Sequence, residues 1–384
     1  LKHEKRHKYN KHLTTSRRTP LMVALYENKF NIVKLLLKKY NNPGIYYKDI
    51  DGNCALSYAC KYSNLESVKF LIRKGRKRNI NTRNNNNETP LILSLKHNNR
   101  DVIKFLLNKS NININLIDNN YYNAFNLCCI KGYVEELNLL IKKGVEINLI
   151  NNNGYTGFMF ACKHGKLDIV KVLVEHNVKT NYLSNDGKTG FMLACKNGHT
   201  DIVKFLLNVD ITFKDEINSD KLTPLILSCL KNQIDVVKLL IDNDVNINTK
   251  DKFNLAALNY AFKNNNIDIT ELLLENGGDI NLINYDCVEY CMKNGCEKII
   301  ILLLKRGYTN IIYDKLFLLC TKYNLYNLCK FIISNYNIDL NYFEYDNMKL
   351  FLNNRCININ CEHTPLIVAC MNDNLDIVML LLDN

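Results

Sequence analysis

The chain has 384 residues, a formal net charge of +12, 47% hydrophobic and 23% charged residues. A single hydrophobic core stops growing at about 250–300 residues, so this length excludes one ordinary compact domain and leaves several domains or one elongated array. The longest aliphatic run, Ile299 to Leu304, is too short to cross a membrane, and no apolar stretch of a secretory signal follows the basic start. We therefore expect a cytoplasmic chain, with the nucleus as the alternative.

Residues 1–18 form a basic arm with seven Lys and Arg against Glu4. Such an arm can contact nucleic acid, an acidic surface or a membrane, but the simpler interpretation is a disordered, solvated end. His3 and His7 match the H-E-x-x-H pattern of zinc proteases. That pattern needs a buried helix and a third ligand, whereas here the surroundings are charged, so we interpret the match as chance.

From residue 19 onward the chain repeats itself. Residues 156–174 read TGFMFACKHGKLDIVKVLV, and residues 189–207, which start 33 positions later, read TGFMLACKNGHTDIVKFLL. An apolar anchor residue after Thr-Pro or Thr-Gly, or its equivalent, recurs eleven times at intervals of 35, 35, 34, 33, 33, 34, 33, 30, 29 and 49 residues. The anchors are Leu21, Leu56, Leu91, Phe125, Phe158, Phe191, Leu225, Leu258, Val288, Phe317 and Leu366. Such a period indicates a repeat architecture.

Each copy predicts two short helices. In the sixth copy, Phe191, Ala194 and Cys195 make one helical stripe, Gly198 ends it, and residues 202–207 make a second stripe. The third residue after every anchor is Ala, Ser or Cys. We expect this small residue to let neighbouring helices approach closely.

Polar turns separate the copies. Asp51-Gly52, Asn153-Gly154 and Asp186-Gly187 predict tight turns, and Asn87 and Asn254 can replace the glycine because Asn tolerates positive φ. The same place is held by Tyr121 and Lys221, so we expect different turns there.

The stretches TPLILSLKHNNRDVIKFLLNKS and TPLILSCLKNQIDVVKLLIDNDVNIN resemble ankyrin repeats, including a hairpin visible at residues 144–148 and 278–281. The resemblance covers about residues 19–384 and implies an all-α fold of helix pairs with short β-hairpin-like turns, the ankyrin-repeat solenoid. Tetratricopeptide repeats have a similar period but lack the hairpin.

Several copies depart from the pattern. The fifth and sixth have Thr-Gly in place of Thr-Pro, which we expect to make a more flexible helix start. The ninth and tenth are short and degenerate. The interval of 49 residues before Leu366 predicts an insertion near residues 342–360.

Cysteines recur at the fourth position after the anchor: Cys60, Cys129, Cys162, Cys195, Cys229 and Cys370. Neighbouring helices lie about 8–10 Å apart, which exceeds the reach of a disulfide. We therefore predict that these cysteines stay unpaired and act as small apolar residues in a reducing compartment. Zinc-type donors also gather at Cys356, Cys361, His363 and Cys370. Their spacing is not a standard one, so inert thiols are the stronger interpretation, and we predict no metal.

The sequence lacks a phosphate-binding loop, a nucleophile elbow and a dinucleotide fingerprint. We therefore predict that the chain is not an enzyme and takes no cofactor or small-molecule substrate.

In ankyrin arrays, the resemblance implies, partners contact the hairpin tips and the exposed end of the first helix, on a concave face. The fifth residue after the anchor is Lys in seven of eleven copies. These lysines can attract an acidic partner, or they can simply solubilise a helix end. Our predicted partner-binding residues are Lys61, Tyr62, Lys96, His97, Tyr122, Tyr155, Lys163, His164, Asp186, Lys196, Asn197 and Lys263.

The predicted function is a non-catalytic scaffold that binds a protein, and an acidic one if the lysines are used. The alternative is the recognition module of a larger enzyme or signalling protein, for example a ubiquitin-ligase adaptor, because the chain starts without Met and ends without a polar cap. Ankyrin stacks offer no groove-reading helix, which argues against direct binding of nucleic acid.

Overall fold

Threonine caps begin several of the first helices. Thr19, Thr89 and Thr223 each accept a hydrogen bond from the backbone N–H three residues further on. A proline follows each threonine, at a position where no N–H is needed. The computed structural model describes residues 15–39, 44–75, 80–342, 349–352, 355–358 and 363–384.

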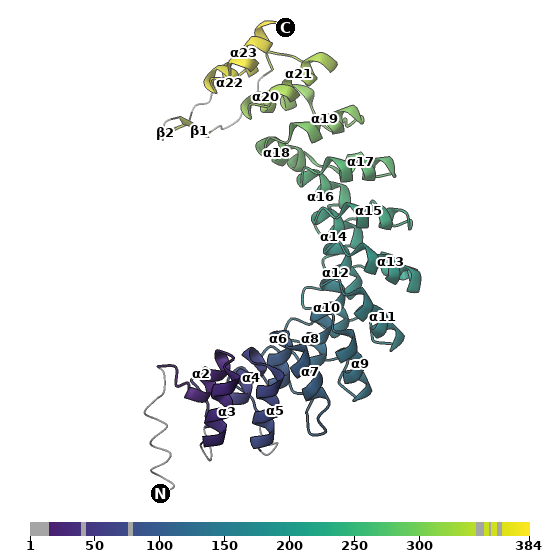
Figure 1. Cartoon of the computed structure of the whole chain (residues 1–384). Helices are drawn as coiled ribbons and strands as arrows, with labels where there is room; N and C mark the ends of the chain where they lie inside the picture. Colours follow the sequence, from purple (N-terminus) through teal and green to yellow (C-terminus); the bar gives the residue numbers. More distant parts are fainter. Residues whose placement is uncertain (1–14, 40–43, 76–79, 343–348, 353–354, 359–362) are drawn as a thin grey trace. The chain divides into compact units, whose positions relative to one another are not determined.

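Two compact units make up the chain. The first holds residues 1–194 and 201–205, and the second holds residues 195–200 and 206–384. The helices of the first unit are α2 (Pro20–Tyr26), α3 (Phe30–Lys39), α4 (Ala55–Tyr62), α5 (Leu65–Lys74), α6 (Pro90–Lys96), α7 (Arg100–Leu107), α8 (Ala124–Lys131), α9 (Val134–Lys142), α10 (Gly157–Lys163) and α11 (Leu167–Glu175) (Figure 1). The boundary between the units falls in α12 (Gly190–Lys196) and α13 (Thr200–Val209).

The helices of the second unit are α14 (Pro224–Leu230), α15 (Ile234–Ile241), α16 (Ala257–Lys263), α17 (Ile267–Glu275), α18 (Tyr285–Lys293), α19 (Glu297–Lys305), α20 (Tyr313–Lys322), α21 (Tyr326–Asn335), α22 (Pro365–Met371) and α23 (Leu375–Leu382). Two short 3₁₀ helices, η1 (Ile211–Asp215) and η2 (Ile280–Leu282), also belong to it. The predicted all-α fold of stacked helix pairs is confirmed.

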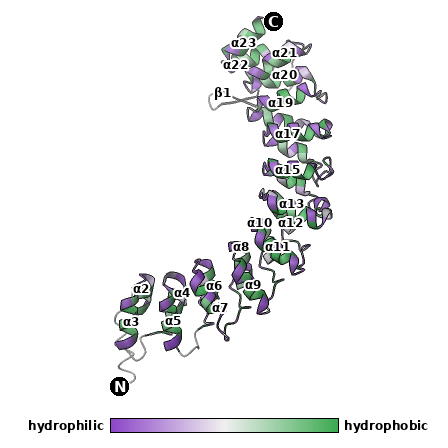
Figure 2. Cartoon of the chain, turned by 45° about the vertical axis from the view of Figure 1, so that its right-hand side comes forward, coloured by the Kyte–Doolittle hydropathy of each residue, from purple (hydrophilic) through white to green (hydrophobic). Residues whose placement is uncertain are grey.

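Neighbouring pairs pack in two rows. In the first unit, the first helices α2, α4, α6, α8 and α10 pack in sequence, and so do the second helices α3, α5, α7, α9 and α11. In the second unit, α14, α16 and α18 pack in one row and α15, α17, α19, α21 and α23 in another. Figure 2 shows the hydrophobic residues along the helices and hydrophilic ones towards the helix ends.

The core lies between the helix layers. The anchors Leu56, Phe125 and Phe158 are at most 1% exposed, and the small residues Ala59 and Ala161 are fully buried. Because a helix pair is too small to bury its own apolar side, each repeat depends on its neighbours for stability.

A carboxyl or amide side chain organises most of the turns between repeats. Asp118 Oδ1, for example, accepts the backbone N–H of Asn120 and Tyr122, at 2.9 Å each. Six turns share this pattern, in which residues i+2 and i+4 donate: those at Asp49, Asn84, Asp118, Asn151, Asn218 and Asp251. Two backbone donors of each turn are thereby satisfied within the turn itself.

The prediction of different turns at Tyr121 and Lys221 is wrong. Tyr121 has φ +61° and Lys221 has φ +57°, in the same left-handed region as Gly154 at +78°. The hydrogen bonds to Asp118 and Asn218 impose the turn whatever residue stands at that position.

Glycine at the helix start of the fifth and sixth repeats has a steric reason, not the flexibility that the sequence suggested. A Cβ at Gly157 would lie 2.4 Å from Cε1 of Phe125, and a Cβ at Gly190 would lie 2.5 Å from Cε1 of Phe158. The phenylalanine anchor of the preceding repeat therefore occupies the space that a side chain would need.

The degenerate repeats differ in their connections. Before α18 the chain forms η2 in place of the turn described above, which shortens the ninth repeat. Between α21 and α22, β1 (Lys349–Leu352) pairs antiparallel with β2 (Arg355–Asn358), with Lys349 opposite Asn358. Both strands lie within residues 342–360, where the sequence predicts an insertion.

Candidate functional site

A four-residue segment joins the two helices of each repeat, from the fifth to the eighth residue after the anchor. We call these segments the helix-joining loops. In the first unit they are residues 61–64, 96–99, 130–133 and 163–166, and in the second they are residues 196–199, 230–233, 263–266, 293–296 and 322–325. The set covers repeats two to ten.

In repeats two to ten the helix-joining loops contain no acidic residue, whereas the equivalent segments of the first and eleventh repeats, residues 26–29 and 371–374, hold Glu27 and Asp373. The 36 loop positions of repeats two to ten hold ten Lys and three His but no Asp or Glu, whereas the chain average of 38 acidic residues in 384 would place about three or four there. The helix dipole explains a lysine at the end of a first helix. It does not explain why Asp, a preferred N-cap residue, is absent from the start of each second helix. The loops of repeats two to ten therefore carry a net positive charge.

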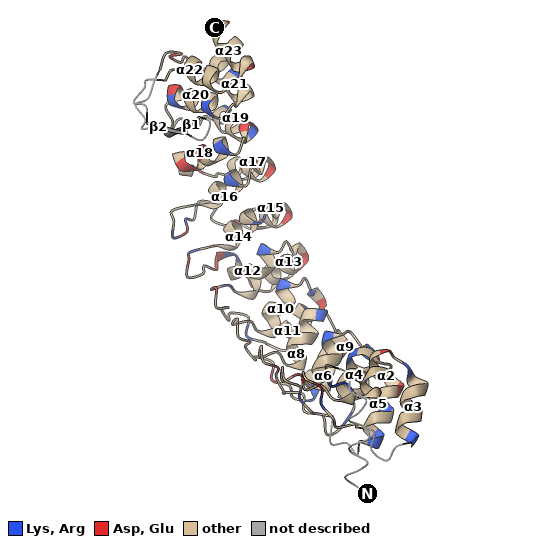
Figure 3. Cartoon of the chain, turned by 90° about the vertical axis from the view of Figure 1, so that its left-hand side faces the viewer, with Lys and Arg blue, Asp and Glu red and all other residues tan. Residues whose placement is uncertain are grey.

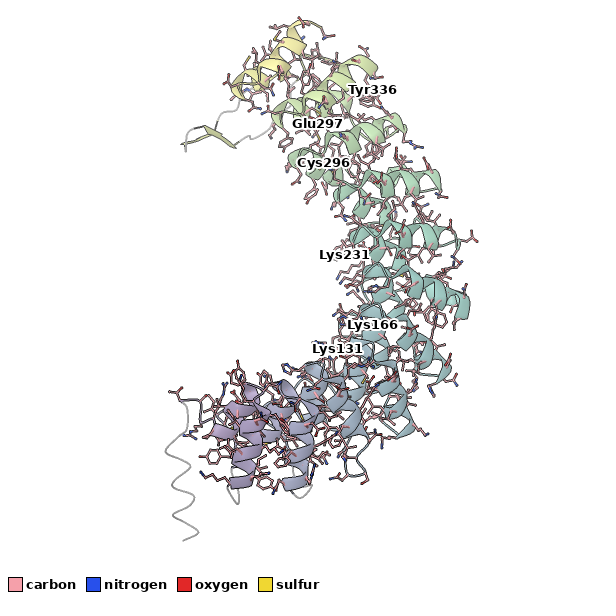
Figure 4. The ribbon with its side chains drawn as sticks, in the orientation of Figure 1. Lys131, Lys166, Lys231, Cys296, Glu297 and Tyr336 are labelled. Atoms are coloured by element: carbon pink, nitrogen blue, oxygen red, sulfur yellow. The ribbon has the colours of Figure 1, made fainter. Side chains whose placement is uncertain are left out.

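Eight of the ten loop lysines stand in the last turn of a first helix. Figure 3 shows the Lys and Arg residues of the described chain in blue. In the first unit, Figure 4 shows Lys131 and Lys166 of these loops, and Cδ of Lys166 would lie 3.1 Å from a Cβ built at Gly132. In the second unit, Lys231 is exposed at the end of α14 (Figure 4).

Three aromatic rings form a continuous row across the first three repeats. The rings of Tyr26 and Tyr62 are 4.8 Å apart between centroids, and those of Tyr62 and His97 are 5.8 Å apart. Tyr26 is 44% exposed and Tyr62 is 38% exposed, and Lys61 Nζ lies 4.9 Å from the Tyr62 ring. Exposed, pre-packed tyrosines lose little conformational entropy on binding, so this row can anchor a partner.

Lys96 has a structural role that the sequence did not reveal. Its Nζ donates to Glu88 Oε1 at 2.6 Å and to Asp118 Oδ2 at 2.7 Å, so it links the turns that precede α6 and α8. Burial lowers the pKa of Lys96, but the hydrogen bonds to Asp118 and Glu88 outweigh it, and the pKa is raised overall. The charge of Lys96 is therefore compensated by carboxylates of the protein itself. The sequence leads us to expect an exposed ammonium group at this position, as in a simple row of lysines.

A second aromatic cluster lies on repeats four and five. The rings of Tyr122 and Tyr155 lie 5.3 and 5.4 Å from that of Phe160, and Lys163 Nζ lies 4.9 Å from the Tyr155 ring. The pKa of Tyr155 is raised, chiefly by burial and also by the negative charge of Asp186. The structure thus brings two predicted tyrosines and Lys163 together.

Asp186 is occupied within its own turn. It accepts a hydrogen bond from the Ser184 hydroxyl at 2.5 Å and forms an ion pair with Lys188. Burial raises the pKa of Asp186, but these two donors lower it by more, so the carboxyl remains ionised well below neutral pH. Like Lys96, this residue is engaged inside the protein.

The other predicted residues occupy equivalent loop positions. His164 follows Lys163 at the end of α10, and Lys196 and Asn197 stand at the end of α12. Lys263 is half-buried at the end of α16 in the second unit.

Sequence reasoning missed four contributors in the first unit: Arg18, Tyr26, Lys131 and Lys166. Arg18 lies 5.4 Å from the Tyr26 ring and 5.5 Å from the Tyr58 ring, behind the aromatic row. Tyr26 and Lys131 stand in the fifth and sixth columns after the anchor, so those columns contained the signal. Lys166 belongs to the eighth column, which becomes relevant only once the loop is seen as a unit.

The cysteines are free thiols in the part of the chain that the structure describes. Burial raises the pKa of Cys60, Cys129 and Cys229, as expected for inert core thiols. Cys370 is exposed, contrary to the buried column expected from its position.

Among the described residues, no group of three or more His, Cys, Asp and Glu side chains could hold a metal ion. The side chains of Cys356 and Cys361 lie outside the described residues, as do His3 and His7. The expectation that residues 356–370 bind no zinc therefore stays a prediction. No described helix combines the length and apolar character that a membrane crossing requires.

Comparison with known proteins agrees with this architecture. A family model described as ankyrin repeats (3 copies) matches residues 1–84, 21–118, 76–151, 125–215 and 208–284, and a model of the single ankyrin repeat matches residues 361–384. The degenerate ninth and tenth repeats fall in the unmatched stretch between them. No curated protein matches the chain.

The fold and its surface define a helical repeat protein that acts as a protein–protein interaction module. The chain belongs to the ankyrin repeat family, which is typically non-catalytic.

Proposed function

We propose that the chain is a non-catalytic scaffold that binds an acidic protein segment along its helix-joining loops and the adjoining turns. The observation that carries this proposal is the absence of Asp and Glu from all 36 loop positions, together with ten lysines. Within each unit, a partner that runs along the loops meets lysines from successive repeats, which favours fast association and discriminates against basic competitors.

The aromatic rings also favour this surface as the binding site. Lysines alone give weak, screened attraction, whereas tyrosines supply most of the binding energy in many interfaces. In the first unit the Tyr26–Tyr62–His97 row and the Tyr122–Tyr155 cluster lie in or beside the loops and turns that carry Lys61 and Lys163. We infer that acidic side chains of the partner face the lysines while its apolar or aromatic side chains contact these rings.

Charge reversal tests the proposal. Lys61, Lys131 and Lys163 are changed together to Glu, and the matched control changes Lys34, Lys142 and Lys171, which are exposed on the second helices α3, α9 and α11. Both variants alter the net charge equally, so only the position differs.

Proteins retained by immobilised wild type and by both variants are identified by mass spectrometry at low and high salt, and the affinity of a purified partner is then measured. We expect the loop variant to weaken binding by about tenfold or more and the control to retain it, with salt-sensitive association. Identical partner lists for all three proteins that survive high salt would contradict the proposal.

A further inference from the structure

His97 is the titratable member of the aromatic row. It caps the C-terminus of α6, the residue is exposed although its imidazole is partly covered, and the ring centroids of His97 and Tyr62 lie 5.8 Å apart. Since α4 packs against α6, and Tyr62 also contacts Tyr26, the imidazole forms one end of the aromatic row and lies within the surface proposed to bind a partner.

The charges that face His97 come from three helices and one turn. Lys61 of α4 and Lys131 of α8 act on it from either side, and Lys96 and Glu88 act from its own repeat. Glu88 is already hydrogen-bonded to Lys96, as is Asp118 of the next turn. Burial lowers the pKa of His97, and the charges of Lys61, Lys131 and Lys96 lower it further against the opposing effect of Glu88. The free protein therefore holds a neutral His97 between cations at neutral pH.

We infer that His97 takes up a proton when an acidic segment binds along the loops, so that this surface binds its partner more tightly as the pH falls. This inference rests on the proposed function, since the partner supplies the carboxylates. An anion placed between Lys61 and Lys131 offsets their repulsion of the imidazolium and can accept its N–H hydrogen bonds. Without the partner, the two lysines disfavour a charged His97 imidazole. With the partner bound, its carboxylates favour that charge.

The direction of the effect follows from linkage. The pKa of His97 is low in the free protein and higher in the complex, so the complex binds more protons in the interval between the two values. Affinity then rises as the pH falls through the pKa of the complex and levels off below that of the free protein. Each unit of difference between the two pKa values corresponds to about tenfold in affinity.

The test uses the full chain and a fluorescein-labelled acidic peptide of glutamates interrupted by tyrosines, whose dissociation constant is measured by anisotropy between about pH 7.5 and 5.5, where its carboxylates stay largely ionised. His97→Gln removes the titration but keeps a polar side chain at the same exposed place. His176→Gln is the matched control, because His176 is also an exposed C-cap residue but lies at the end of a second helix, α11.

We expect the wild type and the His176 variant to bind about tenfold more tightly at the lower pH, and His97→Gln to show no such gain while matching the wild type at the higher pH. The imidazole resonances of the wild type should give a higher His97 pKa with saturating peptide than without it. Salt-sensitive binding with the same pH profile in all three proteins would overturn the role of His97 and leave the proposed function standing. Failure of this acidic and aromatic peptide to bind the wild type at any of these pH values would overturn both.

Discussion

A Cβ at Gly157 would lie 2.4 Å from Cε1 of Phe125, so the two positions in neighbouring repeats share one space. Gly157→Ala should destabilise the protein by about 1–3 kcal/mol, because the added methyl group overpacks a buried site against the ring and the Cys129 thiol. Urea denaturation followed by circular dichroism measures the change.

Phe125→Leu provides the second half of a double-mutant cycle. On its own it should destabilise by leaving a cavity, but in combination with Gly157→Ala the two effects should partly cancel, since the methyl group enters the vacated space. Strictly additive free energies would show that the two residues do not compete.

Lys221 has φ +57°, a conformation that costs a residue with a Cβ about 1–2 kcal/mol. Lys221→Gly should therefore raise the midpoint of thermal unfolding. The free energy of unfolding should increase by about 0.5–1 kcal/mol, because glycine removes the strain but also gives the unfolded chain more entropy. Lys221→Ala is the control, because it removes the lysine but retains the strain. Equal stabilities of the Gly and Ala variants would refute this explanation.

Lys96→Met should destabilise the first unit by about 1–3 kcal/mol at neutral pH, because it leaves Glu88 and the nearly buried Asp118 without their shared cation. Burial raises the pKa of Glu88, but the hydrogen bonds from Lys96 and Asn84 lower it by more. A carboxyl group whose pKa is lower in the folded than in the unfolded protein stabilises the folded state at pH values above its unfolded pKa. That contribution disappears as the pH falls through the pKa of the folded state.

The difference between wild type and Lys96→Met should accordingly shrink in acid and stay constant from about pH 6 to 9, where Glu88 is ionised and Lys96 protonated. Guanidinium denaturation of both proteins across this range provides the comparison. A difference that grows in acid would show that the ion pairs are not its source.

Thiol reactivity reports directly on burial. With Cys356 and Cys361 replaced by serine, iodoacetamide should modify Cys370 first and the partly exposed Cys296 second. The buried thiols, among them Cys60 and Cys129, should react only on unfolding, because burial raises their pKa and blocks access. Peptide mapping by mass spectrometry after timed labelling gives the order, and early modification of Cys129 would argue against the described packing.

Much of the architecture could be predicted from the sequence alone. The period of the anchors, the small residue three positions later and the polar turns predicted stacked helix pairs, because helical periodicity and turn chemistry are local properties of a chain. The lysine column was also visible in this way, and it marked the edge on which Tyr62 and His97 lie.

Tertiary structure alone decided which side chains meet across repeats. The engagement of Lys96 by Asp118, the ring of Phe125 against Gly157 and the contact of Tyr26 with Tyr62 join residues 22 to 36 positions apart. Such contacts depend on how one helix pair is rotated and shifted against the next, and many residue choices satisfy the same local pattern. The same reason explains Tyr121 and Lys221, whose left-handed turns are imposed by hydrogen bonds to Asp118 and Asn218 and not by their own preference.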